Sequence, residues 1–228
     1  MTLPGYIAKE LRRSPPKDCC VQQDALPQIA EGYLEEAKVA TVGINPRGAA
    51  KRADYLPMDA GGDEQAWDHK RRYFERRKYS YFTHIEPILN ACGASFGGKY
   101  DPEGRYAPAV SLDFVQWATD PLWAGLSQEA KTRLLDDGAP FFIELLNRNP
   151  NIDLLLANGR SVVTQMASLF NRQFPEWSEP GLGTNLFCGE VLGRQFIGWS
   201  TFLSNSTLNR RQRAALAERV GELYLNGC

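Results

Sequence analysis

The sequence predicts an α/β fold, a three-layer α/β/α sandwich built around a mostly parallel four-stranded sheet. Short apolar segments rich in β-branched residues recur along the chain, and stretches with helical periodicity separate them. Strands joined by helical crossovers lie parallel in one sheet and carry helices on both faces. With 228 residues, of which 43% are hydrophobic, the chain is expected to form one domain over residues 1–228 with a sizeable core.

The first part of the chain contains a predicted arm, a helix and a strand. Residues 1–23 hold a proline pair and little periodicity, which indicates an N-terminal arm that is packed on the surface or partly loose. Asp24 is expected to cap a helix that continues to about Ala37. The apolar run that ends at Val42 is then predicted to be the first, buried strand.

The remaining chain alternates between helices and strands. Three further strands are expected, at residues 109–115, 151–157 and 194–199. Helices are expected between and after them, at residues 65–78, 127–136, 140–148, 161–173 and 209–225. Ser127 is the predicted cap of the second of these helices, and Gly138 and Pro140 separate the second from the third. Predicted loops, rich in glycine, proline or polar residues, cover residues 48–65, 93–108 and 174–189.

Polar residues gather where the predicted strands end. Asn45 follows the first strand, Asp113 and Gln116 lie at the end of the second, and Asn158 follows the third. A polar segment, residues 204–211, follows the fourth. Because parallel strands end at one edge of a sheet, we expect these groups to converge on one ligand.

The turn after the first strand reads Gly43-Ile44-Asn45-Pro46 and continues with an arginine and a glycine. Gly43 permits a tight bend or the close approach of another group, and Pro46 keeps Asn45 out of the helical conformation. This turn resembles the first motif of the uracil-DNA glycosylase superfamily, and in particular of its mismatch-type uracil/thymine DNA glycosylases. In that motif a strand ends in Gly-Ile-Asn-Pro-Gly, from which Arg47 departs.

The segment after the fourth strand resembles the second motif of these enzymes, which reads roughly Asn/His-Pro-Ser-Gly-Leu-Ser/Asn-Arg. The matching serine, leucine, polar residue and arginine are Ser206, Leu208, Asn209 and Arg210. Ser204 and its neighbour replace the leading Asn/His and Pro, so this motif is degraded. The resemblance covers residues 38–224 as an architecture and only these two motifs in residue detail.

The resemblance implies a hydrolase of DNA base excision repair that breaks the N-glycosidic bond of a damaged or deaminated base flipped from DNA. Asn45 would act by positioning the attacking water, because an amide is a weak base. The implied DNA contacts are Ser206, Asn209, Arg210 and Arg211. The expected base-binding residues, from the first turn, the aromatic segment and the strand ends, are Gly43, Ile44, Pro46, Tyr81, Phe82, Asp113, Gln116 and Ser204.

Asp113 stands near the position where these enzymes usually read the base with an asparagine. An ionised aspartate accepts hydrogen bonds and donates none, so Asp113 would favour a base edge rich in donors over the mixed edge of uracil. The alternative is a buried carboxylate that fixes a loop or caps a helix. Two other functions stay open: a non-catalytic protein of the same fold that binds nucleic acid or a nucleobase, and an N-glycosidase acting on a small-molecule nucleoside.

Composition limits other classes of function. The net charge of −1 gives no global basic field, so DNA, the expected partner, requires a local patch. The basic residues interleaved with aromatic residues over 70–78 form either such a patch or a solvated helix face. No Cys-x-x-Cys pair occurs and the two histidines are far apart in sequence, so neither a metal nor a cofactor is expected. The sequence lacks a membrane-length apolar run and a signal-peptide core, which predicts a reduced cytoplasmic protein.

Overall fold

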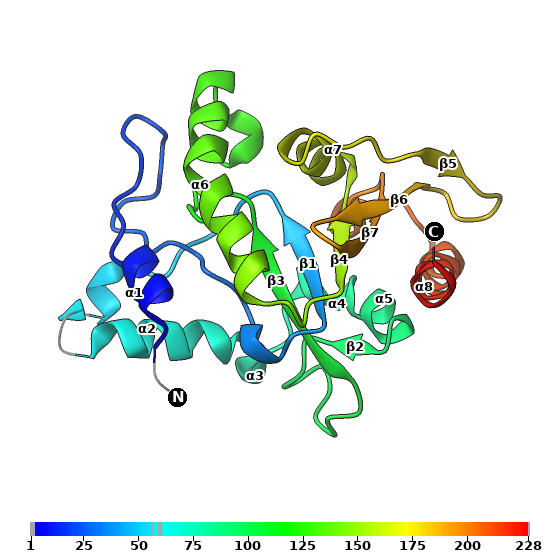
Figure 1. Cartoon of the computed structure of the whole chain (residues 1–228), viewed down its shortest axis with the longest axis horizontal. Coiled ribbons are helices and arrows are strands. Elements are labelled where there is room, and N and C mark those ends of the chain that lie inside the picture. Colours follow the sequence, from blue (N-terminus) through cyan, green and yellow to red (C-terminus); the bar gives the residue numbers. More distant parts are fainter. Residues whose placement is uncertain (1–2, 56, 59–60, 228) are drawn as a thin grey trace.

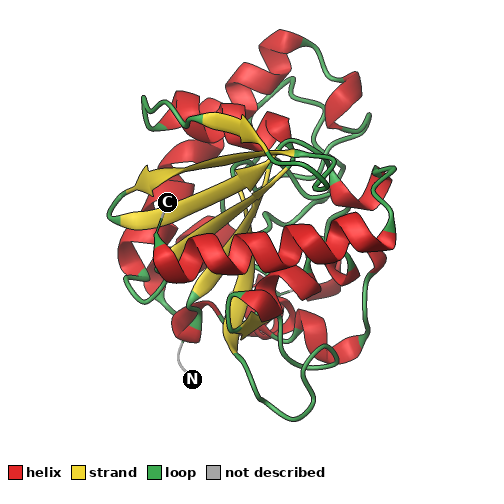
Figure 2. Cartoon of the chain, turned by 90° about the vertical axis from the view of Figure 1, so that its right-hand side faces the viewer, coloured by secondary structure: helices red, strands yellow, loops and turns green. Residues whose placement is uncertain are grey.

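The computed structural model describes residues 3–55, 57–58 and 61–227, which form a mixed α/β fold around a twisted sheet (Figures 1 and 2). The prediction of an α/β fold with a mostly parallel sheet is confirmed. The predicted number of strands is wrong, since the sheet has seven strands rather than four. In sheet order the strands are β2 (Ala94–Ser95), β3 (Ala107–Asp113), β1 (Val39–Gly43), β4 (Leu154–Asn158), β7 (Arg194–Trp199), β6 (Asn185–Val191) and β5 (Glu176–Ser178).

The four strands expected from the sequence form the parallel centre of this sheet. β1 lies between β3 and β4 and runs parallel to both, with Val39 paired to Ala109 on one side and to Leu154 on the other. β7 runs parallel to β4. The C-terminal ends of β1, β3, β4 and β7 therefore lie along one edge of the sheet, which we call the carboxyl edge.

The additional strands lie at the two sides of this parallel centre. Residues 174–189, predicted as a loop, contain β5 and most of β6. β6 pairs antiparallel with β7 through a turn at Leu192 and Gly193, both of which have positive φ. This pairing satisfies backbone groups that would otherwise stay free along β7. On the other side, β2 lies within the predicted loop 93–108 and pairs with β3.

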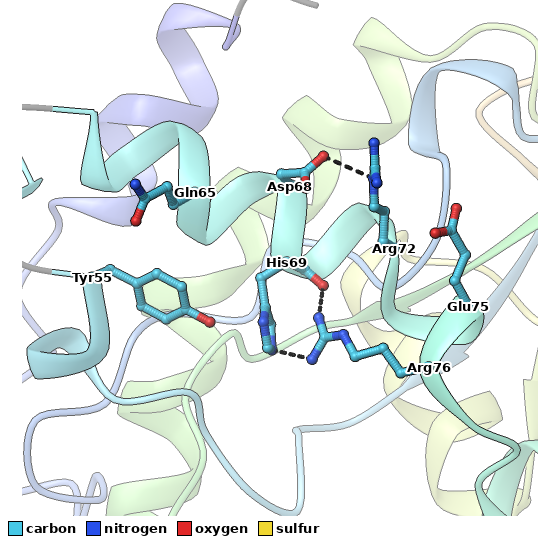
Figure 3. Close-up of a pocket in the computed structure, with 7 residues that line it drawn as sticks. All are labelled: Tyr55, Gln65, Asp68, His69, Arg72, Glu75 and Arg76. Carbon is cyan, nitrogen blue, oxygen red and sulfur yellow. Dashed lines mark hydrogen bonds and ion pairs between the residues drawn. The ribbon is translucent and has the colours of Figure 1, made fainter.

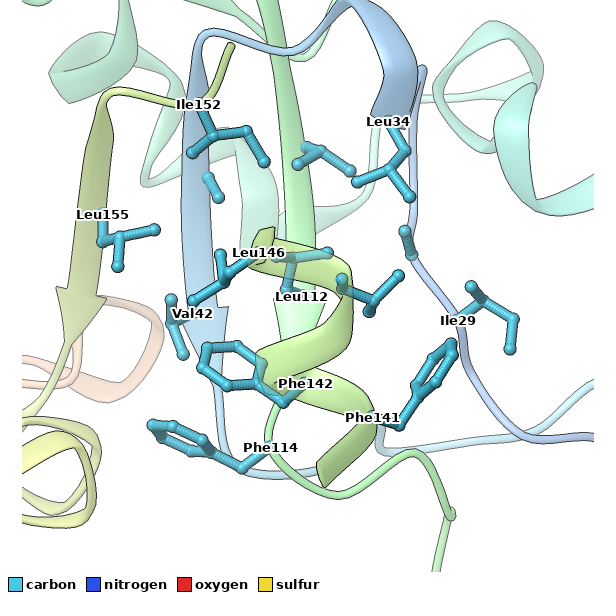
Figure 4. Close-up of a cluster of buried hydrophobic side chains, with 14 of the residues drawn as sticks. Ile29, Leu34, Val42, Leu112, Phe114, Phe141, Phe142, Leu146, Ile152 and Leu155 are labelled. Carbon is cyan, nitrogen blue, oxygen red and sulfur yellow. The ribbon is translucent and has the colours of Figure 1, made fainter. Parts of the chain in front are cut away.

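Helices cover both faces of the sheet. One face packs against α1 (Gly5–Leu11), α6 (Gln128–Arg148) and α7 (Arg160–Leu169). The other face packs against α3 (Tyr73–Arg76), α4 (Ser80–Thr83), α5 (Glu86–Ala91) and α8 (Arg210–Asn226). α2 (Gly62–Arg71) contacts α1. Figure 4 shows the first face, where Phe142 and Leu146 of α6 project onto Val42 and Leu112 of the central strands.

Residues 128–148 form one helix instead of the two predicted helices. The Ser127 hydroxyl accepts a hydrogen bond from the Ala130 N–H at 3.1 Å, so the predicted cap is confirmed. Gly138 does not end the helix; it lets α6 approach Phe114, whose carbonyl oxygen would collide with a Cβ there. Pro140 lies inside the helix. Tertiary packing of the apolar face of α6 thus overrides the helix-breaking tendency of these two residues.

The helix predicted between Asp24 and Ala37 is wrong. Glu31 and Ser111 instead exchange both backbone hydrogen bonds, at 3.0 and 2.9 Å, so this segment extends the sheet beside β3. Only Leu34–Glu36 forms a short 3₁₀ turn. The free backbone donors and acceptors along β3 require partners, and satisfying them prevails over the helical spacing of apolar residues in this segment.

The N-terminal arm belongs to the core, because Ile7 and Leu11 of α1 are fully buried. The arm was predicted to lie on the surface, and its apolar residues explain why it does not. Two predicted helices are confirmed in outline. Residues 65–78 contain most of α2 and all of α3, and the terminal helix is α8, capped by Asn209.

Candidate functional site

Asn45 lies just beyond the end of β1 and is partly exposed at the carboxyl edge. Its Nδ2 donates to the Trp117 carbonyl oxygen at 3.5 Å and to the Thr119 hydroxyl at 3.3 Å. These two acceptors orient the carboxamide through its NH₂ group. Among the residues that the structure describes, none donates a hydrogen bond to Asn45 Oδ1. Asn45 therefore presents an oriented acceptor oxygen that has no hydrogen-bond donor among the described residues.

The N-terminal arm fixes the segment that holds Asn45. The Gln22 N–H donates to the Ala118 carbonyl oxygen at 2.9 Å, and the Asp120 N–H donates to the Cys20 carbonyl oxygen at 2.9 Å. Residues 20–22 thus form a strap across residues 118–120. The arm contributes to the orientation of Asn45 although it is distant in sequence.

Asp113 ends β3 directly beside Gly43, the last residue of β1. A Cβ added at Gly43 would collide with Asp113 Oδ1, so the carboxyl group lies across the Gly43 Cα. The absence of a side chain at Gly43 is what permits this approach. Asp113 is partly exposed, yet loss of hydration raises its pKa to about 7, and the charge of Lys70 offsets only part of this effect.

Lys70 acts electrostatically on Asp113, and Asp113 in turn acts on Glu31. Lys70 is 2% exposed, and its Nζ donates to Gln28 Oε1 at 2.8 Å. Burial lowers the pKa of Lys70 to about 8, against the opposing effect of Glu31. Burial raises the pKa of Glu31 to about 8; the charge of Asp113 raises it further, and Lys70 lowers it. We call Glu31, Lys70 and Asp113 the acid–lysine cluster.

Tyr81 and Asn158 adjoin this cluster. Asn158, at the end of β4, is 1% exposed, and its Oδ1 accepts hydrogen bonds from Trp199 Nε1 at 3.0 Å and from the Leu203 N–H at 3.1 Å. Its Nδ2 donates to the Tyr81 hydroxyl at 3.5 Å. Burial raises the pKa of Tyr81, and the nearby carboxyl groups raise it further. The hydroxyl is therefore un-ionised at neutral pH and retains a proton that it can donate to a ligand.

Two phenylalanines near Tyr81 differ in their surroundings. Phe82 is 6% exposed and meets the rings of Phe74 and Phe96 edge-on at 4.9 Å, so it belongs to the core. Phe202 is 41% exposed, and its ring centre lies 5.7 Å from that of Tyr81. Sequence reasoning named Phe82 and missed Phe202. The available signal for Phe202 was an aromatic residue three residues after the end of the fourth strand.

Arg213 of α8 organises residues 203–208, which follow β7. Its guanidinium donates to the carbonyl oxygens of Leu203 and Leu208, each at 3.0 Å, and to the Ser206 hydroxyl at 3.1 Å. The Ser206 hydroxyl in turn donates to the Leu203 carbonyl oxygen at 3.2 Å. Arg213 Nη1 also lies 3.0 Å from His84 Nδ1, which links this loop to the end of α4.

The other residues of the second motif lie at or near the start of α8. Asn209 Oδ1 accepts a hydrogen bond from the Gln212 N–H, and the Gln212 side chain accepts one from the Asn209 N–H, both at 3.0 Å. This capping box occupies the Asn209 side chain. Arg210 and Arg211 are exposed and form no ion pair with any described residue. Ser204 is partly exposed in the preceding 3₁₀ turn.

Gln116 does not reach the accessible part of the carboxyl edge. It is fully buried; its Nε2 donates to the Asp113 carbonyl oxygen at 3.0 Å, and its Oε1 accepts from Arg13 at 3.4 Å. These bonds give Gln116 a structural position below the strand end. Ile44 and Pro46, by contrast, are partly exposed on either side of Asn45.

Sequence reasoning missed Glu31 and Lys70. Glu31 fell within a predicted helix, and Lys70 fell within a charged helix whose basic residues were expected to be solvated or to contact phosphate. A signal for Lys70 was present, because it lies at helical spacing from Ala66 and Trp67, the apolar positions of α2. No comparable signal exists for Glu31, which reaches the site through the unexpected pairing with β3.

Two surface pockets lie away from this edge. The first, of about 460 Å³, is formed by α2, α3 and the 3₁₀ turn at Arg52–Tyr55 and is lined by Tyr55, Gln65, Asp68, His69, Arg72, Glu75 and Arg76 (Figure 3). Its arginines are paired within the pocket, Arg72 with Asp68 at 3.2 Å and Arg76 with His69 Nε2 at 2.5 Å. The second, of about 440 Å³, includes Tyr6, Glu35 and Arg148. Neither lining contains a predicted site residue.

Neither a protein-family model nor a curated protein sequence matches this chain. Within the described ranges, no helix combines the length and the apolarity needed to cross a membrane. Nor do the described His, Cys, Asp and Glu side chains form a group of three or more that could hold a metal ion. The described side chains at the carboxyl edge include an amide, two carboxyl groups, a buried amine and a phenol.

Proposed function

We propose that the protein is a DNA glycosylase-like N-glycosidase, which hydrolyses the bond between deoxyribose and a damaged or deaminated base flipped from DNA. The observation that carries this proposal is the state of Asn45. Its NH₂ group is held by Trp117 and Thr119, while Oδ1 accepts no hydrogen bond from the part of the chain that the structure describes. A carboxamide oxygen fixed in this way can accept a hydrogen bond from a water molecule and aim that water at the anomeric carbon of the sugar.

The neighbouring groups suit the charges that develop in this reaction. The sugar passes through a cationic, oxocarbenium-like state, and the departing base becomes negative and requires hydrogen-bond donors. The Tyr81 hydroxyl is such a donor, and its raised pKa keeps it un-ionised. Asp113, partly exposed across Gly43, is the side chain best placed to contact the base edge.

Exposed cations near the carboxyl edge support an anionic partner. Arg210 and Arg211 begin α8, and the loop before them is tied to α4 through the contact between Arg213 and His84. Arg77 and Lys78, which precede α4, are also exposed. Contacts from such side chains to phosphates give affinity that falls with rising salt. DNA is therefore the partner that we propose for this surface.

The non-catalytic alternative draws support from the second motif. Ser204 replaces the residue that would reach the base, and the Ser206 hydroxyl already bonds to Leu203 and Arg213. In that case the protein would bind DNA or a nucleobase without releasing the base. Binding and base release must therefore be measured side by side.

The test uses purified protein and labelled duplexes that contain uracil, hypoxanthine, xanthine or an alkylated base. We expect release of at least one of these bases, and a loss of about a hundredfold or more in Asn45→Ala, because misplacing a reacting group by about 1 Å has effects of that size. Asn226→Ala, at the exposed end of α8, is the matched control and should retain full activity. Duplex binding without release selects the non-catalytic alternative. Release from free nucleosides alone selects a small-molecule glycosidase.

A further inference from the structure

Two cysteines stand side by side where the N-terminal arm meets the segment that orients Asn45. Cys19 and Cys20 are both free thiols. Cys20 belongs to the strap, because its carbonyl oxygen accepts the hydrogen bond from the Asp120 N–H at 2.9 Å. A covalent change at this pair therefore acts on the backbone that ties the arm to the Asn45 segment.

The two thiols differ in their surroundings. Cys19 is 1% exposed and packs in a small apolar cluster with Val115 and Trp117. Its Sγ donates to the Lys17 carbonyl oxygen at 3.3 Å. Cys20 is exposed to solvent. Burial raises the pKa of the Cys19 thiol. Because the thiolate is the reactive form, an oxidant meets Cys20 first and leaves Cys19 as the adjacent thiol.

The other described cysteines do not compete for an oxidant. Cys92 and Cys188 are both buried in the core on the face covered by α5 and α8. Burial also raises the pKa of Cys92 to about 12, which suppresses its thiolate. Among the described cysteines, Cys20 is therefore the thiol that solvent reaches.

A disulfide between adjacent residues imposes a geometry that the reduced strap lacks. Bonded cysteines normally have Cα atoms about 4.4–6.8 Å apart, whereas adjacent Cα atoms are about 3.8 Å apart. Such a ring is strained, and the strain makes the bond easy to reduce again. Its closure also brings together two side chains that now face different surroundings, the apolar cluster and the solvent. The backbone at Cys19 and Cys20 must rotate for this to happen.

The backbone of this turn is already in an uncommon conformation. Asp18 and Cys20 have positive φ angles of 58° and 53°, which are unfavourable for residues that carry a side chain. The strap hydrogen bonds help to hold Cys20 in this conformation. Rotation away from it relieves strain in the turn, so the closure of the ring and the loss of the strap favour each other.

The strap in turn steadies Asn45. Val21 forms an antiparallel bridge with Thr119, which lies between the two positions that the strap bonds hold. The Thr119 hydroxyl accepts the hydrogen bond from Asn45 Nδ2 at 3.3 Å. A rotation at Cys20 withdraws the carbonyl oxygen that holds Asp120, and the hydroxyl next to it loses its fixed position.

We propose that Cys19 and Cys20 form a reversible redox switch, in which a peroxide joins them in a vicinal disulfide that withdraws the strap and releases the Asn45 carboxamide. The Cys20 thiolate first attacks a peroxide oxygen and becomes a sulfenic acid, and one water molecule leaves. The Cys19 sulfur then attacks the sulfenic sulfur, which forms the S–S bond and releases a second water. Two thiols and one hydrogen peroxide thus give one disulfide and two waters, with two electrons passing from sulfur to the peroxide.

This inference concerns the regulation of the carboxyl edge, and its effect on base release rests on the proposed function. The reduced protein is the form with an oriented Asn45, and the oxidised protein is the form without it. A dithiol reductant restores the first form by thiol–disulfide exchange. Cys19 and Cys20 are positioning residues, since they act on Asn45 only through the strap.

The first experiment asks whether the ring forms. The full chain is treated with hydrogen peroxide, its remaining thiols are alkylated, and a tryptic digest is analysed by mass spectrometry. Cleavage after Lys17 and Lys38 gives one peptide, residues 18–38, that carries both thiols. We expect this peptide to be unalkylated and lighter by two hydrogen atoms. Recovery of the peptide with two alkylated thiols, with Cys20 as a sulfinic acid, or in a cross-linked dimer overturns the proposal.

The second experiment asks whether the ring acts on Asn45. The side-chain NH₂ resonances are followed in ¹H–¹⁵N spectra, with Asn45 assigned by Asn45→Ala. Peroxide should shift the Asn45 resonance in wild type, and dithiothreitol should return it. The NH₂ group of Asn149, which donates to the Leu145 carbonyl oxygen at 2.7 Å, should stay unchanged. An oxidised peptide with an unmoved Asn45 resonance overturns the switch.

Two variants separate ring formation from general oxidation, and each is compared before and after peroxide treatment. Cys20→Ser replaces an exposed thiol, so it should fold and its Asn45 resonance should not respond to peroxide. Cys19→Ser removes the buried thiol and should likewise abolish the response, if circular dichroism shows that it folds. An Asn45 response that persists in folded Cys20→Ser contradicts the proposal.

Base release provides the last measurement. If the reduced protein releases a base from a duplex, ring formation should lower the rate by about tenfold or more, because a displaced reacting group loses its alignment. An unchanged rate in the oxidised protein overturns the switch. The mass and resonance measurements need no catalysis. A protein that passes both but releases no base from any duplex refutes the proposed glycosylase activity and leaves the redox control of Asn45 standing.

Discussion

The two faces of the central strands present different chemistry at the same height in the sheet. On the face covered by α6, β1 and β3 carry Val42 and Leu112, both 1% exposed. One residue later, on the other face, the same strands end in Gly43 and Asp113, which are partly exposed. Because side chains alternate between faces along a strand, one residue can pack in the core while the next presents a polar group on the opposite face. One face belongs to the hydrophobic core. The other holds the titratable carboxyl group of Asp113 beside Gly43, which has no side chain.

This division predicts that truncation on the α6 face acts on stability alone. Phe142 is fully buried and its ring centre lies 4.8 Å from that of Phe114. Phe142→Ala should lower the free energy of unfolding by about 3–5 kcal/mol, through lost apolar contact and the cavity left behind. Urea unfolding followed by circular dichroism measures this change. Leu225→Ala, at a position 77% exposed, should change it by less than about 0.5 kcal/mol.

A smaller effect is expected at the other face, where one added methyl group should disturb both stability and chemistry. Gly43→Ala places a Cβ against Asp113 Oδ1, and we expect a loss of about 1–3 kcal/mol from the forced displacement. Gly48→Ala is the matched control, because nothing lies within 4 Å of a Cβ at that position. A Gly43→Ala protein as stable as wild type and with an unmoved Asp113 titration would show that the two groups are not in contact.

The smallest effect concerns the dependence of stability on pH. Glu31 and Asp113, with pKa values raised to about 8 and about 7, keep protons in the folded protein where the unfolded chain has lost them. The unfolded state thus binds fewer protons, so stability should fall as pH rises towards 8, by at most about 1.4 kcal/mol per pH unit for each retained proton. Between about pH 7 and 7.5 the histidines are mainly neutral in both states, and Lys70, whose pKa is lowered to about 8, is still mainly charged in the folded protein, so neither reverses the sign of this slope.

Urea unfolding at several pH values in that range provides the measurement. Glu31→Gln should flatten the slope, because it removes one of the two retained protons. Glu36→Gln should keep the wild-type slope. A slope of the opposite sign in wild type would mean that the carboxyl groups of the cluster are ionised in the folded protein.

The parallel centre of the fold could be predicted from the sequence because its strands are short, apolar and separated by helices. β7 was placed at its observed bounds, and Ser127 as a cap was correct. The predictions failed where long-range pairing decides the structure. The backbone of Glu31 pairs with Ser111, eighty residues away along the chain, and no local pattern reveals such a partner.

The candidate site shows the same contrast between residues that a local pattern reveals and residues that only long-range contacts bring together. Asn45 and Asp113 could be located because each follows a recognisable strand, and a strand end has a predictable position in a parallel sheet. The groups that tune them could not be located in this way. Lys70 was assigned to a charged face because charged runs are usually solvated, although its spacing from Trp67 placed it on the apolar side of α2. Arg213 lies beyond the motif that directed attention to its neighbours, and only its contacts reveal that it holds the loop.

The strap formed by residues 20–22 has a consequence for how the carboxyl edge is assembled. Its two hydrogen bonds join the beginning of the polypeptide to residues 118–120, near the middle. Shortening the polypeptide from its amino terminus up to that point would therefore release the Thr119 hydroxyl that steadies Asn45. A protein truncated in this way would keep its sheet and most of its helices but would lose the fixed orientation of the Asn45 carboxamide.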